Sequence, residues 1–241
     1  MGSTAVEFRL RVVIMTAIIT LGFWAPWIEG WGIGYRTPLL EWLPAELSRS
    51  GLLRFTVAAP VVIVLAAAVA AAAVVLRIWG TAYLGHGTVN HAEMKAGAVQ
   101  AGGPYRFVRN PLYLGSWWMF AAMAFIMPVT GALFAMVLLT VFLLRLILGE
   151  EAFLTGQLGE PYRAYLRSVP RLLPRLRTAP PASGKPHWFR AVLSELNPIG
   201  VFVIMAFLSW SYDNLLMIKA ILVSFGLSLV VRALMPRREL E

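Results

Sequence analysis

The chain has 241 residues, of which 59% are hydrophobic and 14% are charged, and its formal net charge is +9. Soluble domains carry about a quarter charged residues, so this composition indicates a membrane protein and argues against a soluble enzyme. Basic loops that contact lipid headgroups explain the positive charge better than nucleic-acid binding does. The absence of cysteine excludes disulfides, thiolate metal ligands and a cysteine nucleophile, and the three scattered histidines do not suggest a metal site.

The first third of the chain holds two apolar runs, and a span of the bilayer takes about 20 such residues. Residues 10–27 form the first run, and its bulky end, Phe23 to Trp27, argues against a cleaved signal peptide. Residues 55–79 form the second run. We expect a loop with Pro38 and Pro44 between the two runs, and a polar, glycine-rich segment over residues 80–110.

The rest of the chain supplies four further apolar segments. Residues 112–148 are broken at 128–131 by a Pro-Val-Thr-Gly sequence, which predicts two helices joined by a tight turn. A long basic segment, 149–190, separates them from a short apolar stretch, 198–210, and a final one, 215–234. We therefore predict an all-α, polytopic transmembrane helical bundle of about six spans. It forms a single membrane domain, 1–241, with a C-terminal transmembrane hairpin over 191–236.

The distribution of lysine and arginine predicts the orientation of this bundle. If the N-terminus lies inside, 17 of the 21 basic residues fall on cytoplasmic segments. Such a bias is typical of cytoplasmic loops. It predicts a multi-pass protein of the cell inner membrane with both termini in the cytoplasm, and it puts both polar segments on the cytoplasmic side, where a soluble cofactor is available.

The first motif lies before the third predicted span, where residues 103–115 read GPYRFVRNPLYLG. Pro111 suits the first turn of a helix and Asn110 can cap it. The free amides of such a helix start favour an anionic or carboxylate-bearing ligand. An interfacial anchor made of arginine and tyrosine is the alternative explanation.

The second motif follows the fourth predicted span. It comprises Glu150 and Glu151, then LGEPYRAY over residues 158–165 and VPRLLP over residues 169–174. Helical neighbours point about 100° apart, so only one of the two carboxylates should face a given pocket. We expect Glu150 to do so, because a carboxylate there can bind a nucleoside-like or sulfonium cofactor, and we expect Glu151 to be solvated.

These two motifs, in this order and separated by a helical hairpin, resemble the isoprenylcysteine carboxyl methyltransferase and phospholipid methyltransferase superfamily. The resemblance covers about residues 90–174, the expected methyltransferase core. It implies S-adenosylmethionine bound at the cytoplasmic membrane surface, with Glu150 at the polar end of the cofactor. The cofactor-binding residues implied by position are Asn90, Gly97, Ala98, Val99, Gln100, Tyr105, Arg109, Asn110, Pro111, Leu112, Tyr113, Glu150, Tyr162 and Tyr165.

Two positions bear on catalysis. Eukaryotic members usually have histidine where this chain has Asn110, which cannot be protonated, so the resemblance implies cofactor binding there and not proton transfer. Eukaryotic members also place an arginine near the substrate carboxylate. Arg145 is the nearest match, so Arg145 and Glu150 are the predicted catalytic residues.

The expected reaction is in-line transfer of a methyl group to a lipophilic acceptor, a membrane lipid or a prenylated substrate, which enters laterally from the bilayer. The protein would contribute alignment and desolvation. A nicotinamide-dependent membrane reductase related to the sterol reductases is an alternative, with Arg171, Arg175 and Arg177 available for a 2′-phosphate. A non-catalytic membrane scaffold is a second alternative.

Overall fold

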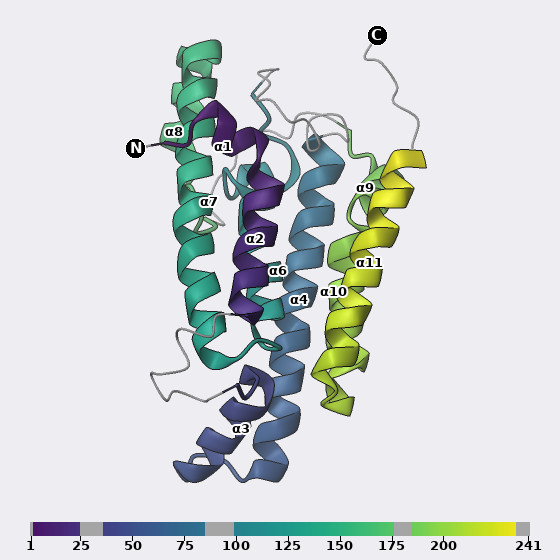
Figure 1. The fold of residues 1–241 in the computed structure, drawn as a ribbon. Helices are drawn as coiled ribbons and strands as arrows, with labels where there is room; N and C mark the ends of the chain where they lie inside the picture. The colour runs from purple at the N-terminus through teal and green to yellow at the C-terminus, as the bar shows by residue number, and fades with distance from the viewer. Residues whose placement is uncertain (1, 25–35, 85–98, 176–184, 235–241) are drawn as a thin grey trace.

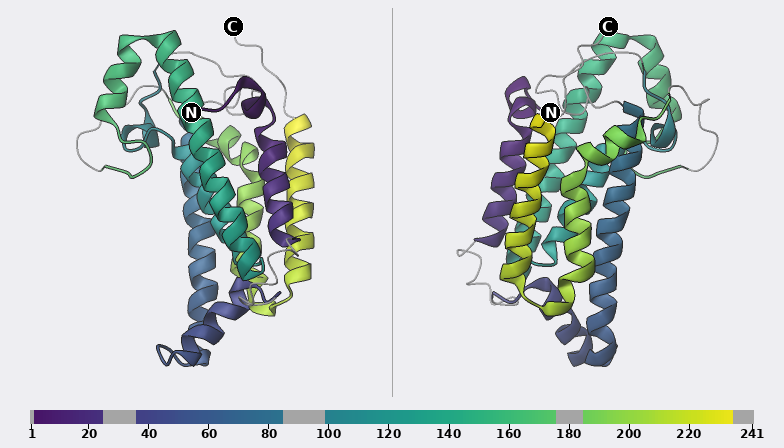
Figure 2. Two further views of the ribbon diagram at one scale, coloured as in Figure 1. Left: turned by 60° about the vertical axis from the view of Figure 1, so that its left-hand side comes forward. Right: turned by 90° about the vertical axis from the view of Figure 1, so that its right-hand side faces the viewer.

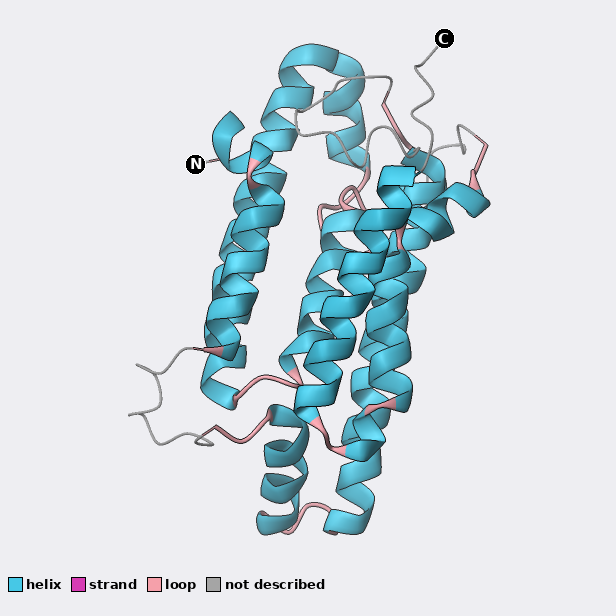
Figure 3. Cartoon of the chain, turned by 45° about the vertical axis from the view of Figure 1, so that its right-hand side comes forward, coloured by secondary structure: helices cyan, strands magenta, loops and turns pink. Residues whose placement is uncertain are grey.

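The computed structural model describes residues 2–24, 36–84, 99–175 and 185–234. Helices make up the regular structure of this part of the chain, and Figure 3 shows them joined by loops. The helices are α1 (Ala5–Arg9), α2 (Arg11–Phe23), α3 (Leu39–Arg49), α4 (Phe55–Leu84), η2 (Gly103–Arg106), α6 (Pro111–Ala124), α7 (Val129–Leu158), α8 (Glu160–Ser168), α9 (Trp188–Ser194), α10 (Leu196–Phe207), η3 (Ser209–Ser211) and α11 (Asn214–Leu234). The predicted all-α membrane bundle is confirmed.

The lengths of these helices decide how many can cross a bilayer. Within the described residues, α4, α7 and α11 are long and apolar enough, and the bent pair formed by α9 with α10 and η3 makes a fourth candidate. The bend between the two parts is 67°. Helix α2 is apolar but has 13 described residues, and α6 has 14 residues, about 21 Å at 1.5 Å per residue. By length and composition, the described helices therefore give three or four span candidates, where the sequence predicted six.

Helix α3 corrects the expected loop between the first two spans. It begins after Pro38, keeps Pro44 inside it, and buries Leu40 completely. Its first two amides donate to the α6–α7 turn, Leu39 N to Met127 O at 2.9 Å and Leu40 N to Phe125 O at 2.7 Å. Two prolines indicated a loop because proline interrupts helices, but burial of the apolar face and bonds from the helix start to a neighbouring turn outweigh that cost.

Small residues allow the long helices to approach closely. Ala66, Ala70 and Ala73 are buried on α4, which packs along α6. At the crossing of α2 and α7, a Cβ added to Gly131 would overlap the backbone of Gly22. Small residues at contact points are how membrane helices gain van der Waals contact, so these positions fix the spacing of the bundle.

One end of the bundle gathers the segments that carry the motifs. Helix α8 folds back beside the end of α7, next to η2 and the start of α6 (Figure 2). Helix α1 and the last turn of α11 lie at this same end, and α3 lies at the opposite end (Figure 1). This arrangement agrees with a topology in which both termini are on the same side of the membrane.

Candidate functional site

The carboxylate of Glu151 is the centre of a buried polar network. Glu151 is 6% exposed, so the expectation that it is solvated is wrong. It accepts hydrogen bonds from Arg109 Nε and Asn110 Nδ2, both at 3.1 Å, and from Arg171 Nη2 at 2.8 Å. Two guanidinium groups compensate the buried charge, which burial alone would make costly. Glu151 therefore ties the two sequence motifs together.

Arg109 extends this connection to the segment that follows α8. Its Nη1 donates to the carbonyl oxygens of Leu166 at 2.6 Å and Val169 at 3.1 Å, and its backbone amide donates to Pro170 O at 2.9 Å. Asn110 precedes Pro111, as expected for a helix start, but its side chain makes no capping bond. The predicted cap is wrong because the amide of Asn110 donates to Glu151 and to a backbone carbonyl across the site instead.

Tyrosines from η2 and α8 form the wall of the site. The Tyr165 hydroxyl donates to the backbone carbonyl of Tyr105 at 2.8 Å. The rings of Tyr162 and Tyr165 lie 5.9 Å apart, and Val99 packs against them. Gly103, at the start of η2, has φ of +54°, and a Cβ there would overlap the Tyr83 ring. The glycine thus lets η2 press against α4 and puts Tyr105 inside the bundle end.

Two polar groups in this region are left for a ligand. The Tyr105 hydroxyl is buried and has no hydrogen-bond partner among the described residues. The carboxylate of Glu150 accepts one hydrogen bond from the described residues, from the Tyr113 hydroxyl at 2.7 Å. The neighbouring glutamates therefore diverge as helical geometry predicts, with Glu151 in the network and Glu150 beside Tyr113.

The tyrosines of the site are neutral at physiological pH. Burial, followed by the negative charge of Glu150, raises the pKa of Tyr105 well above its ordinary value. Burial, followed by the charges of Glu151 and Glu150, raises the pKa of Tyr162 to about 12, and burial also raises the pKa of Tyr165. These hydroxyls can donate hydrogen bonds to a ligand, but they do not supply a phenolate base.

The remaining predicted site residues are distributed as follows. Pro111 is buried at the first turn of α6, and the Leu112 carbonyl accepts from Arg77 Nη1 at 3.4 Å. Gln100 donates to Tyr83 O at 2.6 Å, which holds its segment against α4. Asn90, Gly97 and Ala98 lie outside the described residues, as does Arg177.

The structure gives Arg145 a partner away from the two motifs. Its Nη2 donates to both carboxylate oxygens of Glu7, at 2.9 and 3.0 Å. Arg145 and Glu150 are five positions apart on α7, so their side chains point about 140° apart around the helix. The role of Arg145 at an acceptor carboxylate stays a prediction, and its contact here joins α1 to α7.

Sequence reasoning missed a second buried ion pair close to the first motif. Arg77 Nε on α4 donates to Glu195 Oε2 at 2.6 Å, and the Thr81 hydroxyl donates to Glu195 Oε1 at 2.6 Å. The Glu195 side chain is fully buried. Arg77 also donates to Ser116 at 2.6 Å. An acidic residue just before an apolar stretch was the available signal, but its partner is 118 positions away.

In the part of the chain that the structure describes, no group of three or more potential metal ligands occurs, so this part offers no candidate metal centre. What the site does offer is a carboxylate with one donor, a buried hydroxyl donor, aromatic walls and a helix start. These groups suit a ligand that carries both positive charge and polar hydroxyl or amino groups.

Comparison with known proteins relates the central part of the chain to a family. A model of the phospholipid methyltransferase family matches residues 54–160. A methanethiol S-methyltransferase from Crocosphaera subtropica is 43% identical over 70 residues, which are 29% of this chain and 27% of the relative's length. No solved structure matches the chain with significance.

The fold is that of a multi-pass helical membrane protein, and its central part, residues 54–160, is similar to the phospholipid methyltransferases. The family model and the relative support the resemblance of this central part to the superfamily of isoprenylcysteine carboxyl methyltransferases and phospholipid methyltransferases, as the motifs indicated. The family match also includes α4, which the motif resemblance had left out. Helix α2 and the α9–α11 region lie outside the matched residues.

Proposed function

We propose that this protein transfers a methyl group from S-adenosylmethionine to a lipophilic acceptor at the cytoplasmic face of the inner membrane. The observation that carries the proposal is that the two motifs held together by the Glu151 network each keep a polar group for a ligand: the buried, unpartnered hydroxyl of Tyr105 in the first, and the carboxylate of Glu150, which accepts one hydrogen bond, in the second. Burial, followed by the charge of Glu150, raises the pKa of Tyr105, so the two groups interact electrostatically.

The residues present fit this cofactor chemically. When bound, S-adenosylmethionine supplies a methyl group on a positively charged sulfur. Glu150 would favour that positive charge and accept from amino or hydroxyl groups, and the Tyr105 hydroxyl would donate to an oxygen or nitrogen. The rings of Tyr162 and Tyr165 would exclude water from the end of the bundle, which strengthens these interactions.

The chain's own residues constrain the acceptor. The tyrosines are neutral and Glu151 is engaged by two arginines and an asparagine, so Glu150 is the remaining candidate base among the described residues of the two motifs. An acceptor that is already nucleophilic, such as a carboxylate or a thiolate, needs no base. The relative from Crocosphaera subtropica is named for methanethiol, which favours a thiol as a second acceptor class.

Calorimetric titration of the detergent-purified protein tests the cofactor. We expect S-adenosylmethionine and S-adenosylhomocysteine to bind the wild type and to lose at least about tenfold in affinity in Glu150→Ala, since a hydrogen bond to a charged group contributes about 1.5–3 kcal/mol. Glu160→Ala removes an exposed glutamate of α8 and should bind as the wild type does. Absence of binding by folded wild type would overturn the proposal.

Two further measurements separate the remaining possibilities. Transfer of labelled methyl to a membrane-lipid extract, compared with transfer to methanethiol, distinguishes a lipophilic acceptor from a small thiol. Titration with reduced nicotinamide phosphate cofactor tests the reductase alternative. One of the arginines considered for the 2′-phosphate, Arg171, is instead paired with Glu151 at 2.8 Å, which disfavours that alternative.

A further inference from the structure

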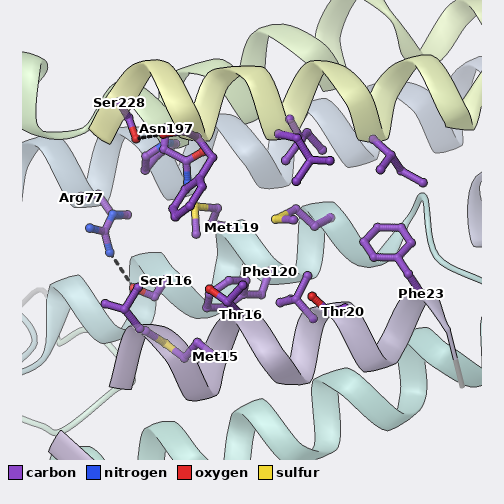
Figure 4. A pocket seen from close by; sticks show the side chains of 18 of the residues that line it. Met15, Thr16, Thr20, Phe23, Arg77, Ser116, Met119, Phe120, Asn197 and Ser228 are labelled. Atoms are coloured by element: carbon purple, nitrogen blue, oxygen red, sulfur yellow. Dashed lines mark hydrogen bonds between the residues drawn. The ribbon is translucent and has the colours of Figure 1, made fainter. Parts of the chain in front are cut away.

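A cavity lies between α2, α6, α10 and α11, with its polar end near the first motif. Its volume is about 240 Å³. Figure 4 shows Met119, Phe120 and Phe23 along its length, with Arg77, Ser116, Asn197 and Ser228 gathered at one end. None of its lining residues is a predicted cofactor residue, and α2, α10 and α11 lie outside the family match.

The cavity is lined by two helices, α2 and α11, that pack on different neighbours. Helix α2 packs on α7, whereas α11 packs on α10. Isoleucine and methionine side chains line the gap from both sides, including Ile19 from α2 and Ile218 and Ile221 from α11. Because α11 is long and apolar enough to cross a membrane, we expect the apolar part of the cavity to lie at the depth of the lipid chains.

The polar end of the cavity carries more positive than negative charge. Arg77 is paired there with Glu195, at 2.6 Å from Nε to Oε2 and 3.1 Å from Nη2 to Oε1. Arg232 enters from α11, and its Nη2 donates to the Ser194 carbonyl at 2.7 Å. Arg232 forms no ion pair with a carboxylate among the described residues, so this end holds two guanidinium groups and one carboxylate, that of Glu195.

Two buried polar atoms at this end have no partner among the described residues, namely Nε of Arg232 and Oδ1 of Asn197. Both residues line the cavity. An unpaired buried polar atom costs free energy unless something in the cavity bonds to it. A guanidinium donor with spare positive charge selects an anionic oxygen, and the amide of Asn197 can bond to a second polar atom of the same group.

We propose that this cavity is a binding site for a single-chain amphiphile with an acidic headgroup. The headgroup would pair with Arg232 and Asn197, and the chain would lie along Met119, Phe120 and Ile218. The volume is below the range of about 300–1,000 Å³ that is usual for drug-sized ligands, so it suits one hydrocarbon chain and not a two-chain phospholipid. This proposal is independent of methyl transfer, because it uses none of the cofactor residues.

Photocrosslinking of the full chain in phosphatidylcholine nanodiscs tests the site. The probe is palmitic acid that carries a diazirine in its chain, and the neutral control is its methyl ester. We expect the acid to label peptides of α2, α6 and α11 roughly tenfold more than the ester does, because a charge-assisted bond exists only for the acid. Equal labelling by acid and ester would overturn the proposal.

Two variants assign the labelling to this cavity. Arg232→Gln should abolish the preference for the acid, whereas Arg49→Gln, a change at an exposed arginine, should keep it. Thr16→Trp, from the α2 wall, fills the cavity without removing charge and should reduce labelling by the acid several-fold. Unchanged labelling in Thr16→Trp would place the probe in the surrounding lipid and contradict the site.

Competition identifies the headgroup chemistry. Unlabelled palmitate or lysophosphatidic acid should displace the photoreactive acid, and the stronger competitor distinguishes a carboxylate ligand from a phosphate ligand. Neutral monopalmitoylglycerol should not compete. Equal competition by the neutral lipid would show that the cavity recognises the chain alone and would overturn the acidic headgroup. Cofactor affinity, measured separately, should not change in any of these variants.

Discussion

The polar networks around Glu151 and Glu195 are built in the same way, but the charged groups that they leave free to bind a ligand have opposite signs. In each, a buried glutamate is saturated by donors: Glu151 by Arg109, Asn110 and Arg171, and Glu195 by Arg77 and Thr81. Beside Glu151, the carboxylate of Glu150 can still accept hydrogen bonds from a ligand. Beside Glu195, the guanidinium of Arg232 can still donate a hydrogen bond to a ligand through its unpartnered Nε.

This difference indicates what each region is suited to bind. A spare carboxylate favours a cation, such as a sulfonium, and a spare guanidinium favours an anionic headgroup. The saturated glutamates hold the helices in place in both regions. Substitution of the saturated glutamates, Glu151 and Glu195, should therefore lower the free energy of unfolding. Substitution of Glu150 or Arg232 should instead lower the affinity for a ligand.

The largest expected effect follows loss of the Glu151 carboxylate. Glu151→Ala leaves Arg109 and Arg171 without their anion, and breaking a buried pair in this way costs about 3–5 kcal/mol of unfolding free energy. Glu160→Ala removes a glutamate whose ion pairs are exposed and should cost less than about 1 kcal/mol. Equilibrium unfolding in a sodium dodecyl sulfate titration measures both, and equal effects would mean that the network does not hold the motifs together.

The next effect concerns the α2 wall of the cavity. Gly131→Ala introduces a methyl group against the backbone of Gly22, and overpacking of this kind costs about 1–3 kcal/mol. Gly156 lies on the same helix with nothing within 4 Å of an added Cβ, so Gly156→Ala should be neutral or slightly stabilising. The same titration compares the two, and a tolerated Gly131→Ala would show that α2 does not depend on this crossing.

A smaller effect should appear at Tyr105. Tyr105→Phe removes a hydroxyl that has no partner among the described residues, so the unfolding free energy should not fall. The affinity for S-adenosylmethionine should fall about tenfold, the value of one hydrogen bond of about 1–1.5 kcal/mol. Tyr212→Phe, at an exposed ring, is the control. Unchanged cofactor affinity in Tyr105→Phe would remove this residue from the proposed site.

The smallest effect is expected where α1 meets α7. A hydrogen bond from the Thr4 amide, followed by one from Arg145, lowers the pKa of Glu7 below its ordinary value of 4.5. The stabilisation is present above pH 4.5 and is lost as the pH falls through the lower pKa of the folded protein. Glu7→Gln should therefore lower Tm slightly at neutral pH, and the difference should vanish in acid. A difference that persists in acid would contradict the ionic contact.

The sequence alone determined the class of the protein because composition and motif order are local properties of the chain. Low charge and long apolar runs predict membrane helices wherever they occur. The order of GPYRFVRNPLYLG, the adjacent glutamates and LGEPYRAY indicated the family, and helical geometry predicted that Glu150 and Glu151 diverge.

The tertiary structure decided the partners of the buried charges, because they come from positions far apart in the chain. Nothing local shows that Glu151 meets Arg109 and Arg171, or that Glu195 meets Arg77 across 118 positions. The cavity beside Arg232 likewise exists only once α2 packs on α7 and α11 on α10. A buried charge needs a partner, but the packing of the helices decides which residue that partner is.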